Sequence, residues 1–245
     1  MKNIIKEWME QYPMLSKYTS STLFMKVEIL MLGLRIDKIF SDTYRVIFEC
    51  CPLWEVDIHK RNTPLIWTEM TDNRKGQFFI SFRRHNDLFQ DAVKCSETQF
   101  GFLLSENIDV NDLYHFIEVI LAQKSKTHNP IDIYRIYELQ LALALYFQDT
   151  DRHNKIKHDI EKEISFWDAN NFFDLFSESI EEWKSNLYQR MENREQLILD
   201  VEQNLKDNKV AKLKSGHIFN SKTQIGSAEN WNCQLKWITK LRTWR

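Results

Sequence analysis

The stretch Thr43–His85, TYRVIFECCPLWEVDIHKRNTPLIWTEMTDNRKGQFFISFRRH, decides the fold that we expect from the sequence. Residues 44–50 alternate between apolar and polar side chains, a period of two that is typical of a strand with one buried face. Similar alternation or a β-rich composition returns in three further runs, at residues 54–59, 64–71 and 77–84. We therefore predict three or four successive antiparallel strands.

The segments on both sides of this stretch have helical periodicity. Hydroxyl side chains at residues 20–22 that can cap a helix, and apolar residues over much of its circumference, predict a buried helix at 23–39. Asp109 is a predicted N-cap, and Asn129-Pro130 is predicted to start a second helix with proline at its first position. The other predictions are helices at 4–13, 86–93, 110–124 and 131–147 and one more strand at 99–104.

Together these predictions give an α+β fold: a small antiparallel sheet of about four strands covered by helices, followed by an all-helical C-terminal half. Apolar residues recur every three or four positions between Phe173 and Val201, which predicts a coiled-coil-like helix pair. Residues 173–205 are either an antiparallel pair within one chain or the seam of a homo-oligomer. A polar joint at 125–129 divides the chain into a predicted sheet domain, 1–128, and a helical domain, 129–245.

The composition excludes several classes of protein. Hydrophobic residues make up 43% and aromatic residues 13% of the chain, enough for a core, so it is not a disordered chain. Only 5 glycines and 4 prolines disfavour an all-β sandwich, which needs many tight turns. The 4 cysteines contain no CxxC pair, so we expect buried free thiols and no metal. Without a signal-like start or an apolar run of about 20 residues, we expect a cytoplasmic protein that does not enter a membrane.

No catalytic motif is present in the sequence. It contains no GxSxG, Walker loop, Rossmann glycine fingerprint or HExxH, and we expect no cofactor. The nearest hydrolase-like set is Asp57, Glu69 and Lys75, but Thr71 occupies the position where a metal-dependent nuclease has lysine. A four-residue hairpin loop at 60–63 would also place the two carboxylates on opposite faces of the sheet.

Two smaller polar groups lie in the same stretch. Glu55, Asp57 and His59 share one face of a regular strand, where a general base or a metal is conceivable, although an outer face needs only polar residues. Arg83, Arg84 and His85 end the predicted fourth strand. They are either an ordinary charge cluster at a strand end or a site for a phosphate or carboxylate.

Charge is distributed unevenly along a chain whose net charge is only −2. Residues 149–205 contain 14 acidic and 7 basic residues, a net charge of −7, whereas residues 206–245 contain 2 acidic and 9 basic residues, a net charge of +7. The basic tail also contains tryptophans, and aromatic and basic residues together can stack bases and neutralise phosphates. The tail residues singled out as a candidate binding site are Trp231, Lys236, Trp237, Lys240, Arg242, Trp244 and Arg245.

These tail residues leave four interpretations open. The tryptophans fill the core while the basic residues meet the acidic segment, or the tail binds a protein partner, a nucleic acid or a membrane face. We favour a non-catalytic cytosolic interaction protein, such as an adaptor, a chaperone-like subunit or a toxin-neutralising subunit, because tryptophan is enriched at binding hot spots. The alternatives are a nucleic-acid-binding component of a larger complex and, with less support, a metal-dependent hydrolase centred on Asp57, His59 and Glu69.

Overall fold

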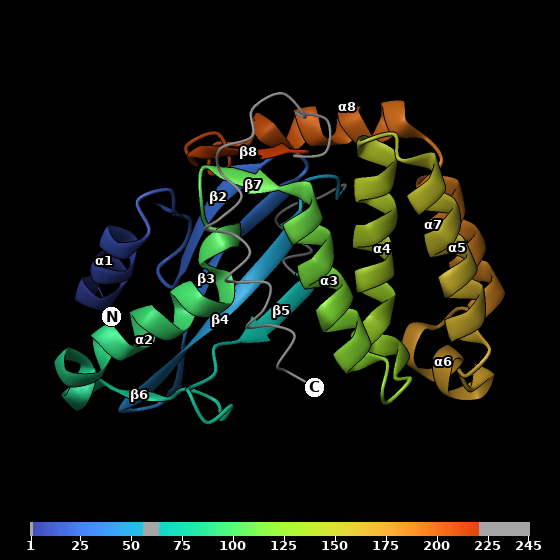
Figure 1. The fold of residues 1–245 in the computed structure, drawn as a ribbon. Coiled ribbons are helices and arrows are strands. Elements are labelled where there is room, and N and C mark those ends of the chain that lie inside the picture. Colours follow the sequence, from blue (N-terminus) through green and yellow to red (C-terminus); the bar gives the residue numbers. More distant parts are fainter. Residues whose placement is uncertain (1, 56–63, 221–245) are drawn as a thin grey trace, which may run out of the picture.

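A computed structural model describes residues 2–55 and 64–220 of the chain (Figure 1). In these residues eight strands form one mixed, strongly curled sheet that resembles half a barrel. The main path of the sheet runs β5-β4-β3-β2-β8-β7, with β1 beside β2 and β6 beside β4. The strands are β1 (Ser16–Lys17), β2 (Thr22–Val27), β3 (Leu30–Phe40), β4 (Thr43–Pro52), β5 (Ile66–Glu69), β6 (Ile80–Ser81), β7 (Asn107–Asp109) and β8 (Ser215–Phe219).

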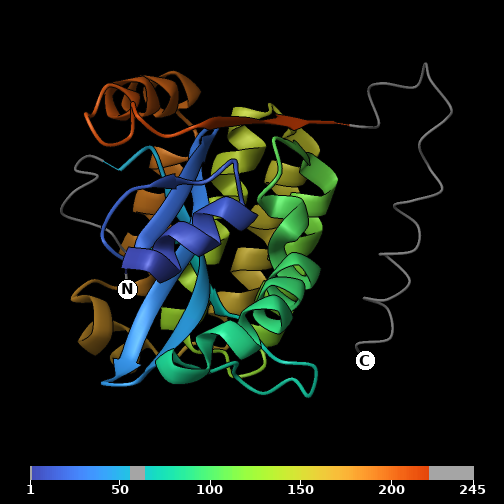
Figure 2. The same ribbon diagram turned by 90° about the vertical axis from the view of Figure 1, so that its left-hand side faces the viewer.

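Eight α-helices accompany the sheet in the described residues. In Figure 1, α3, α4 and α5 lie side by side, while α8 runs across the top of the molecule in Figures 1 and 2. Two 3-10 turns, η1 (Phe82–Arg84) and η2 (Gly101–Leu103), flank α2. The helices are α1 (Lys2–Gln11), α2 (His85–Phe100), α3 (Val110–Lys124), α4 (Pro130–Tyr146), α5 (Thr150–Ile164), α6 (Ala169–Phe176), α7 (Ile180–Arg190) and α8 (Arg194–Leu205). Among them we find none with the length and apolar composition that a bilayer crossing requires.

The predicted small antiparallel sheet followed by an all-helical half is wrong. Strands β1 to β6 pair antiparallel, but β8 pairs parallel with both β2 and β7, so the sheet is mixed. Strand β8 comes after α8, in the segment predicted to be helical, and fills the position between β2 and β7. The partners of β8 lie more than 100 residues away in the chain, so no pattern of neighbouring residues predicts this pairing. The division into domains 1–128 and 129–245 stays a prediction.

The predicted helix at 23–39 is instead the β2–β3 hairpin. Leu23 pairs with Leu34 and Val27 with Leu30, and the turn places Glu28 at φ 51°, in the left-handed region. Strand β2 and the first half of β3, Leu30 to Leu34, are buried at nearly all positions because the sheet is covered on both faces at this end. Burial on both faces removes the alternation of a strand and leaves a continuous apolar run, which resembles a buried helix.

The predicted hairpin between residues 54–59 and 64–71 is also wrong in register. Strand β5 pairs with β4 itself, so Glu69 lies opposite Ile47 and not opposite Trp54. The main chain at Trp54 and Glu55 is not in a strand, and residues 56–63 lie outside the described residues. The predicted strand at 77–84 is reduced to the two residues of β6, which pair with Thr43 and Tyr44.

For the other helices, the predicted first residues agree with the structure better than the predicted last residues do. Asp109 and Asn129 cap α3 and α4 through their side chains, and Pro130 opens α4, as predicted. Helix α2 runs to Phe100 and continues into η2, so the strand predicted at 99–104 is absent. Residues 173–205, predicted to form a helix pair, are divided among α6, α7 and α8. The homo-oligomer seam assigned to them stays a prediction.

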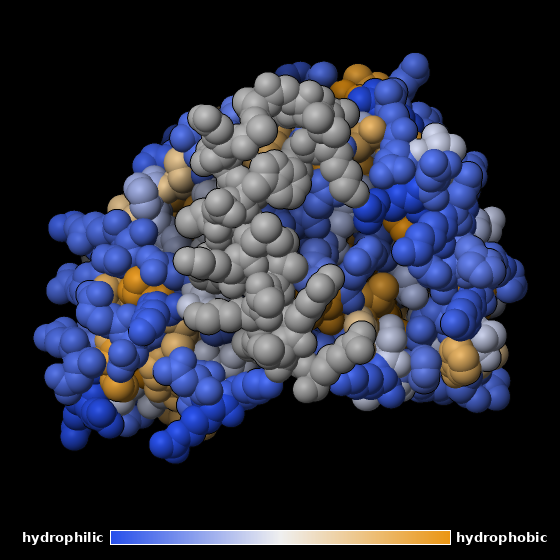
Figure 3. Space-filling view, viewed as in Figure 1, coloured by the Kyte–Doolittle hydropathy of each residue, from blue (hydrophilic) through white to orange (hydrophobic). Residues whose placement is uncertain are grey.

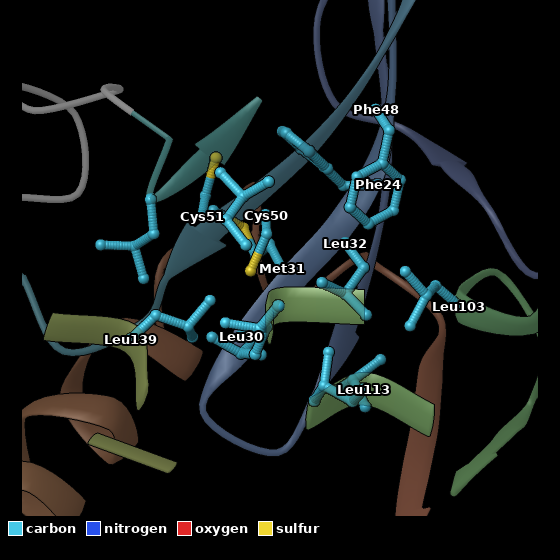
Figure 4. Close-up of a cluster of buried hydrophobic side chains, with 14 of the residues drawn as sticks. Phe24, Leu30, Met31, Leu32, Phe48, Cys50, Cys51, Leu103, Leu113 and Leu139 are labelled. Atoms are coloured by element: carbon cyan, nitrogen blue, oxygen red, sulfur yellow. The ribbon is translucent and has the colours of Figure 1, made fainter. Parts of the chain in front are cut away.

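The core is one continuous cluster that extends from α1 through the sheet to α8. Figure 4 shows Leu30 and Leu32 of β3 and Cys50 and Cys51 of β4 among side chains from α3 and α4. The two thiols are buried and free, as is Cys95, and burial raises the pKa of all three. They fill space as small hydrophobic side chains.

Candidate functional site

The predicted binding residues of the basic tail, Trp231 to Arg245, lie outside the described residues, as do Asp57 and His59. The structure therefore tests neither the tail nor the convergence of the three hydrolase candidates. Glu69, the one described member of that set, belongs to β5 and is ion-paired with Arg45. Lys75 lies in the turn after β5 at φ 63°. Within residues 2–55 and 64–220, no group of three or more His, Cys, Asp or Glu side chains is arranged to hold a metal ion.

Glu69 is part of a charged ladder that crosses three neighbouring strands. Arg45 of β4 lies between Asp37 of β3, at 3.0 Å from Nη2 to Oδ2, and Glu69 of β5. One step along the strands, Nε of Arg35 lies 2.8 Å from Oε1 of Glu49. Opposite charges on adjacent strands pair with one another. Cross-strand ion pairing therefore accounts for the charged residues on this face of the sheet without a catalytic role.

Glu49 is the buried member of the ladder, and it gives a prediction about pH. Burial raises the pKa of its carboxyl above 4.5, Arg35 opposes this rise, and Asp37 adds to it. A carboxyl whose pKa is higher in the folded protein stabilises it at low pH, and this contribution is lost as pH rises through the folded pKa. The difference in free energy of unfolding, wild type minus Glu49→Gln, is therefore expected to fall between about pH 4 and neutral. Urea titrations across that range measure it, and a difference that grows with pH would show that the Arg35 ion pair dominates.

A second polar network is buried between the end of β4 and α4. Glu55 and Glu138 are both buried, and Arg135 lies between them, with Nη2 3.1 Å from Oε1 of Glu55 and Nη1 3.7 Å from Oε2 of Glu138. Arg190 of α7 and the indole N–H of Trp54 also reach Oε1 of Glu138, at 3.2 and 3.4 Å. Glu55, one of the three residues predicted to share an outer strand face, is thus paired inside the protein. Each charge has an opposite partner, which is what a buried ionic group needs to be tolerated.

A third network joins α1, β4 and α2. The hydroxyl of buried Tyr44 lies 2.8 Å from Nδ1 of His85, and Nε2 of His85 lies 2.7 Å from Oε2 of Glu7. Burial raises the pKa of the Tyr44 hydroxyl well above 10. From the sequence, His85 is only predicted to lie at a strand end beside Arg83 and Arg84. Its partners Tyr44 and Glu7 are far away in the chain, so no local sequence pattern predicts them. The hydroxyl is sealed in the core, so the chain Tyr44–His85–Glu7 positions α1 and α2 against the sheet.

Three exposed large apolar side chains lie on α4, on α6 and in the segment after α5, apart from Leu199 of α8, which is equally exposed. Ile131, Phe166 and Phe173 are 50%, 57% and 56% exposed. Tyr134 stacks edge-on against Phe176, with ring centroids 5.0 Å apart. We call these five residues the apolar helix end; they come from the start of α4, the segment after α5, and α6. Figure 3 shows a small hydrophobic spot over α6, at the lower right, surrounded by hydrophilic surface.

The loops around the apolar helix end are fixed by polar contacts. Nδ1 of His128 lies 2.8 Å from Oε1 of buried Glu163, and the His128 ring stacks on Phe166 at 4.4 Å between centroids. The Asp168 side chain accepts a hydrogen bond from the main-chain N–H of Asn171 and caps α6. The exposed rings are therefore held in place by an ordered scaffold. No sequence pattern distinguishes them from core residues, because Phe172, beside Phe173, is fully buried.

Neither a known protein family, nor a curated protein, nor a solved structure matches the chain. What the protein does is therefore argued from its own residues.

Proposed function

We propose that the chain is a non-catalytic interaction protein of the cytosol that binds a protein partner through the apolar helix end. The observation that carries the proposal is that Ile131, Phe166 and Phe173 are each at least half exposed on adjoining elements. Single apolar residues scattered over a surface need no explanation, whereas several on neighbouring elements are a candidate for an interaction site. Aromatic side chains bury a large area for few rotatable bonds, which suits them to binding.

Charge specifies the chemistry of the partner. Phe166 and Phe173 belong to the segment 149–205, whose net charge is −7. Asp174 lies between Phe173 and Leu175 on α6 and is exposed. An apolar centre with an acidic surround complements a partner segment that combines apolar and basic side chains, because charge complementarity speeds association and excludes acidic competitors.

We expect the double variant Ile131→Ser/Phe173→Ser to lose at least tenfold in affinity for a stoichiometric partner captured with the tagged protein, since it removes two exposed apolar anchors. Its thermal midpoint should stay within about 2 °C of the wild type, because exposed substitutions change stability little. Phe40→Ser is the matched control: Phe40 is 67% exposed at the end of β3, far along the sheet from α6. Affinity is measured by titration of the captured partner, after nuclease treatment.

Two results would contradict this assignment. The first is that Ile131→Ser/Phe173→Ser and Phe40→Ser bind the partner equally well. The second is that Trp237→Ala/Trp244→Ala abolishes binding while Ile131→Ser/Phe173→Ser retains it, which would move the interface to the basic tail.

A second candidate, a nucleic-acid-binding component of a larger complex, is supported by the net charge of +7 over residues 206–245 and the tryptophans among these basic residues. Phosphate neutralisation releases counterions, so affinity for a single-stranded oligonucleotide would fall steeply as salt rises. If the affinity for the captured partner does not change with salt, binding through the apolar helix end is favoured over nucleic-acid binding by the basic tail.

A further inference from the structure

A cavity of about 260 Å³, open to solvent on one side, is lined by residues of α3, α4 and α5 and the residue that follows α3. Its wall includes apolar side chains, and its polar groups come from all three helices. The polar lining residues are Glu118 of α3, Ser125 directly after α3, Gln140 of α4, and Arg152, Lys155 and Asp159 of α5.

Gln140 is the unusual member of this lining. It lies in the middle of α4, where neighbouring residues from Ile136 to Ala144 are buried, and it is itself only 6% exposed. Across the described part of the chain its amide makes no hydrogen bond, and yet its polar atoms are not sealed from the cavity. The side chain is thus buried by its neighbours while its amide is open to the cavity, where water or a bound molecule can hydrogen-bond to it.

The charges around Gln140 are of both signs. Arg152 is held rigidly: Nη1 lies 3.6 Å from Oε1 of Glu118, Nε lies 3.3 Å from Oδ2 of Asp149, and the guanidinium lies 3.7 Å from the centre of the Tyr114 ring. Lys155 and Asp159, one helical turn apart on α5, form no ion pair within residues 2–55 and 64–220. A cation and an anion without partners thus lie beside one fixed ion pair and one unpaired amide.

We propose that this cavity binds a small zwitterion that carries a primary amide, in the class of the free amino acids glutamine and asparagine. A glutamine amide offers one donor side and one acceptor side, and another primary amide presents the reverse arrangement and pairs with both at once. A carboxylate offers acceptors alone. Lys155 attracts the carboxylate of the ligand and Asp159 its ammonium group, while the apolar wall contacts its methylene groups.

The test is calorimetric titration of the full chain with L-glutamine, with L-norvaline as a ligand of similar length that lacks the amide. We expect L-glutamine to bind with a dissociation constant of about 1 mM or tighter and L-norvaline at least tenfold more weakly. Gln140→Leu should lose at least tenfold in affinity for L-glutamine, and Lys155→Gln should lose several-fold. Lys162→Gln, a change of an exposed lysine on the same helix that does not line the cavity, should bind like the wild type.

The stability of ligand-free Gln140→Leu is an independent readout. If the amide serves a ligand, leucine removes an unpaired polar group from the interior, and the thermal midpoint of the variant is no lower than that of the wild type. A clear fall in the midpoint would show that Gln140 is structural and overturn the proposal. The proposal also fails if neither L-glutamine nor L-asparagine binds at about 10 mM, or if Gln140→Leu binds L-glutamine as tightly as the wild type.

Discussion

Gly33→Ala is expected to lower the free energy of unfolding by about 3 kcal/mol or more. Gly33 lies in β3 opposite Phe24, and a Cβ atom there would be 1.9 Å from the carbonyl oxygen of Leu23 and 2.5 Å from Cδ1 of Phe24. The oxygen belongs to the main chain of β2, so it cannot move without disturbing the pairing of two central strands. A clash with a main-chain atom has no inexpensive relief, unlike a clash with the end of a flexible side chain.

Gly101→Ala is the matched control for this prediction. Gly101 follows α2 with φ −54° and ψ −37°, and a Cβ there would meet its nearest atom, Cβ of Glu97, at 3.6 Å. Alanine adopts this conformation freely, so the variant should be as stable as the wild type or slightly more stable. Urea denaturation followed by circular dichroism compares the two. A Gly33→Ala protein within about 1 kcal/mol of the wild type would mean that β2 and β3 separate easily at this point.

Arg135→Met is expected to destabilise the protein by about 3–5 kcal/mol, because it leaves the buried carboxylates of Glu55 and Glu138 without the cation between them. Methionine fills a similar volume, so the loss reports charge and not a cavity. The triple variant Glu55→Gln/Arg135→Met/Glu138→Gln should recover much of the loss, since it removes the uncompensated charges.

Arg190→Ala is the matched control for Arg135→Met, because it removes a half-exposed cation from the same network where Arg135→Met removes a buried one. Arg190 also reaches Glu138, at 3.2 Å, but its side chain is 50% exposed, so its removal should cost no more than about 1 kcal/mol. Chemical denaturation at neutral pH measures both variants. Equal losses for the two arginines would mean that water reaches the network.

The sequence predicts those parts of the fold that depend on local chemistry. Asp109 and Asn129 cap helices because their side chains satisfy main-chain N–H groups two residues away, and such signals lie within one turn of the chain. The β4 strand is also predicted, since Arg45 and Glu49 keep a polar-apolar alternation in its sequence even though residues 46–52 are buried on both faces. The β2–β3 hairpin is missed because both of its faces are covered and its turn uses Glu28 in place of glycine. The register of β5 is missed because it depends on which earlier strand it meets.

The candidate sites are predicted less well than the fold, for a related reason. Glu55 was grouped with its sequence neighbours on an outer face, but its partner is Arg135, 80 residues away. Gln140 looks like one polar residue in a helix that is apolar nearly all round, and only the packing of α3 and α5 against α4 shows that its amide faces a cavity. Phe172 and Phe173 are the same residue type side by side, yet Phe172 is buried and Phe173 is exposed because of the orientation of α6. In each case the deciding contact is made across elements.

The place of β8 in the sheet has a consequence for how the protein is made. During synthesis, β2 and β7 emerge early, but the strand that pairs with both is at residues 215–219. Until the ribosome has released that segment, β7 and the end of β2 at Lys26 and Val27 lack this partner, and open strand edges recruit strands from other chains. The nascent chain is therefore expected to be prone to aggregation from the synthesis of β7 until residues 215–219 have left the ribosome. A stalled or prematurely terminated chain that stops before residue 215 would retain these open edges and require a chaperone or degradation.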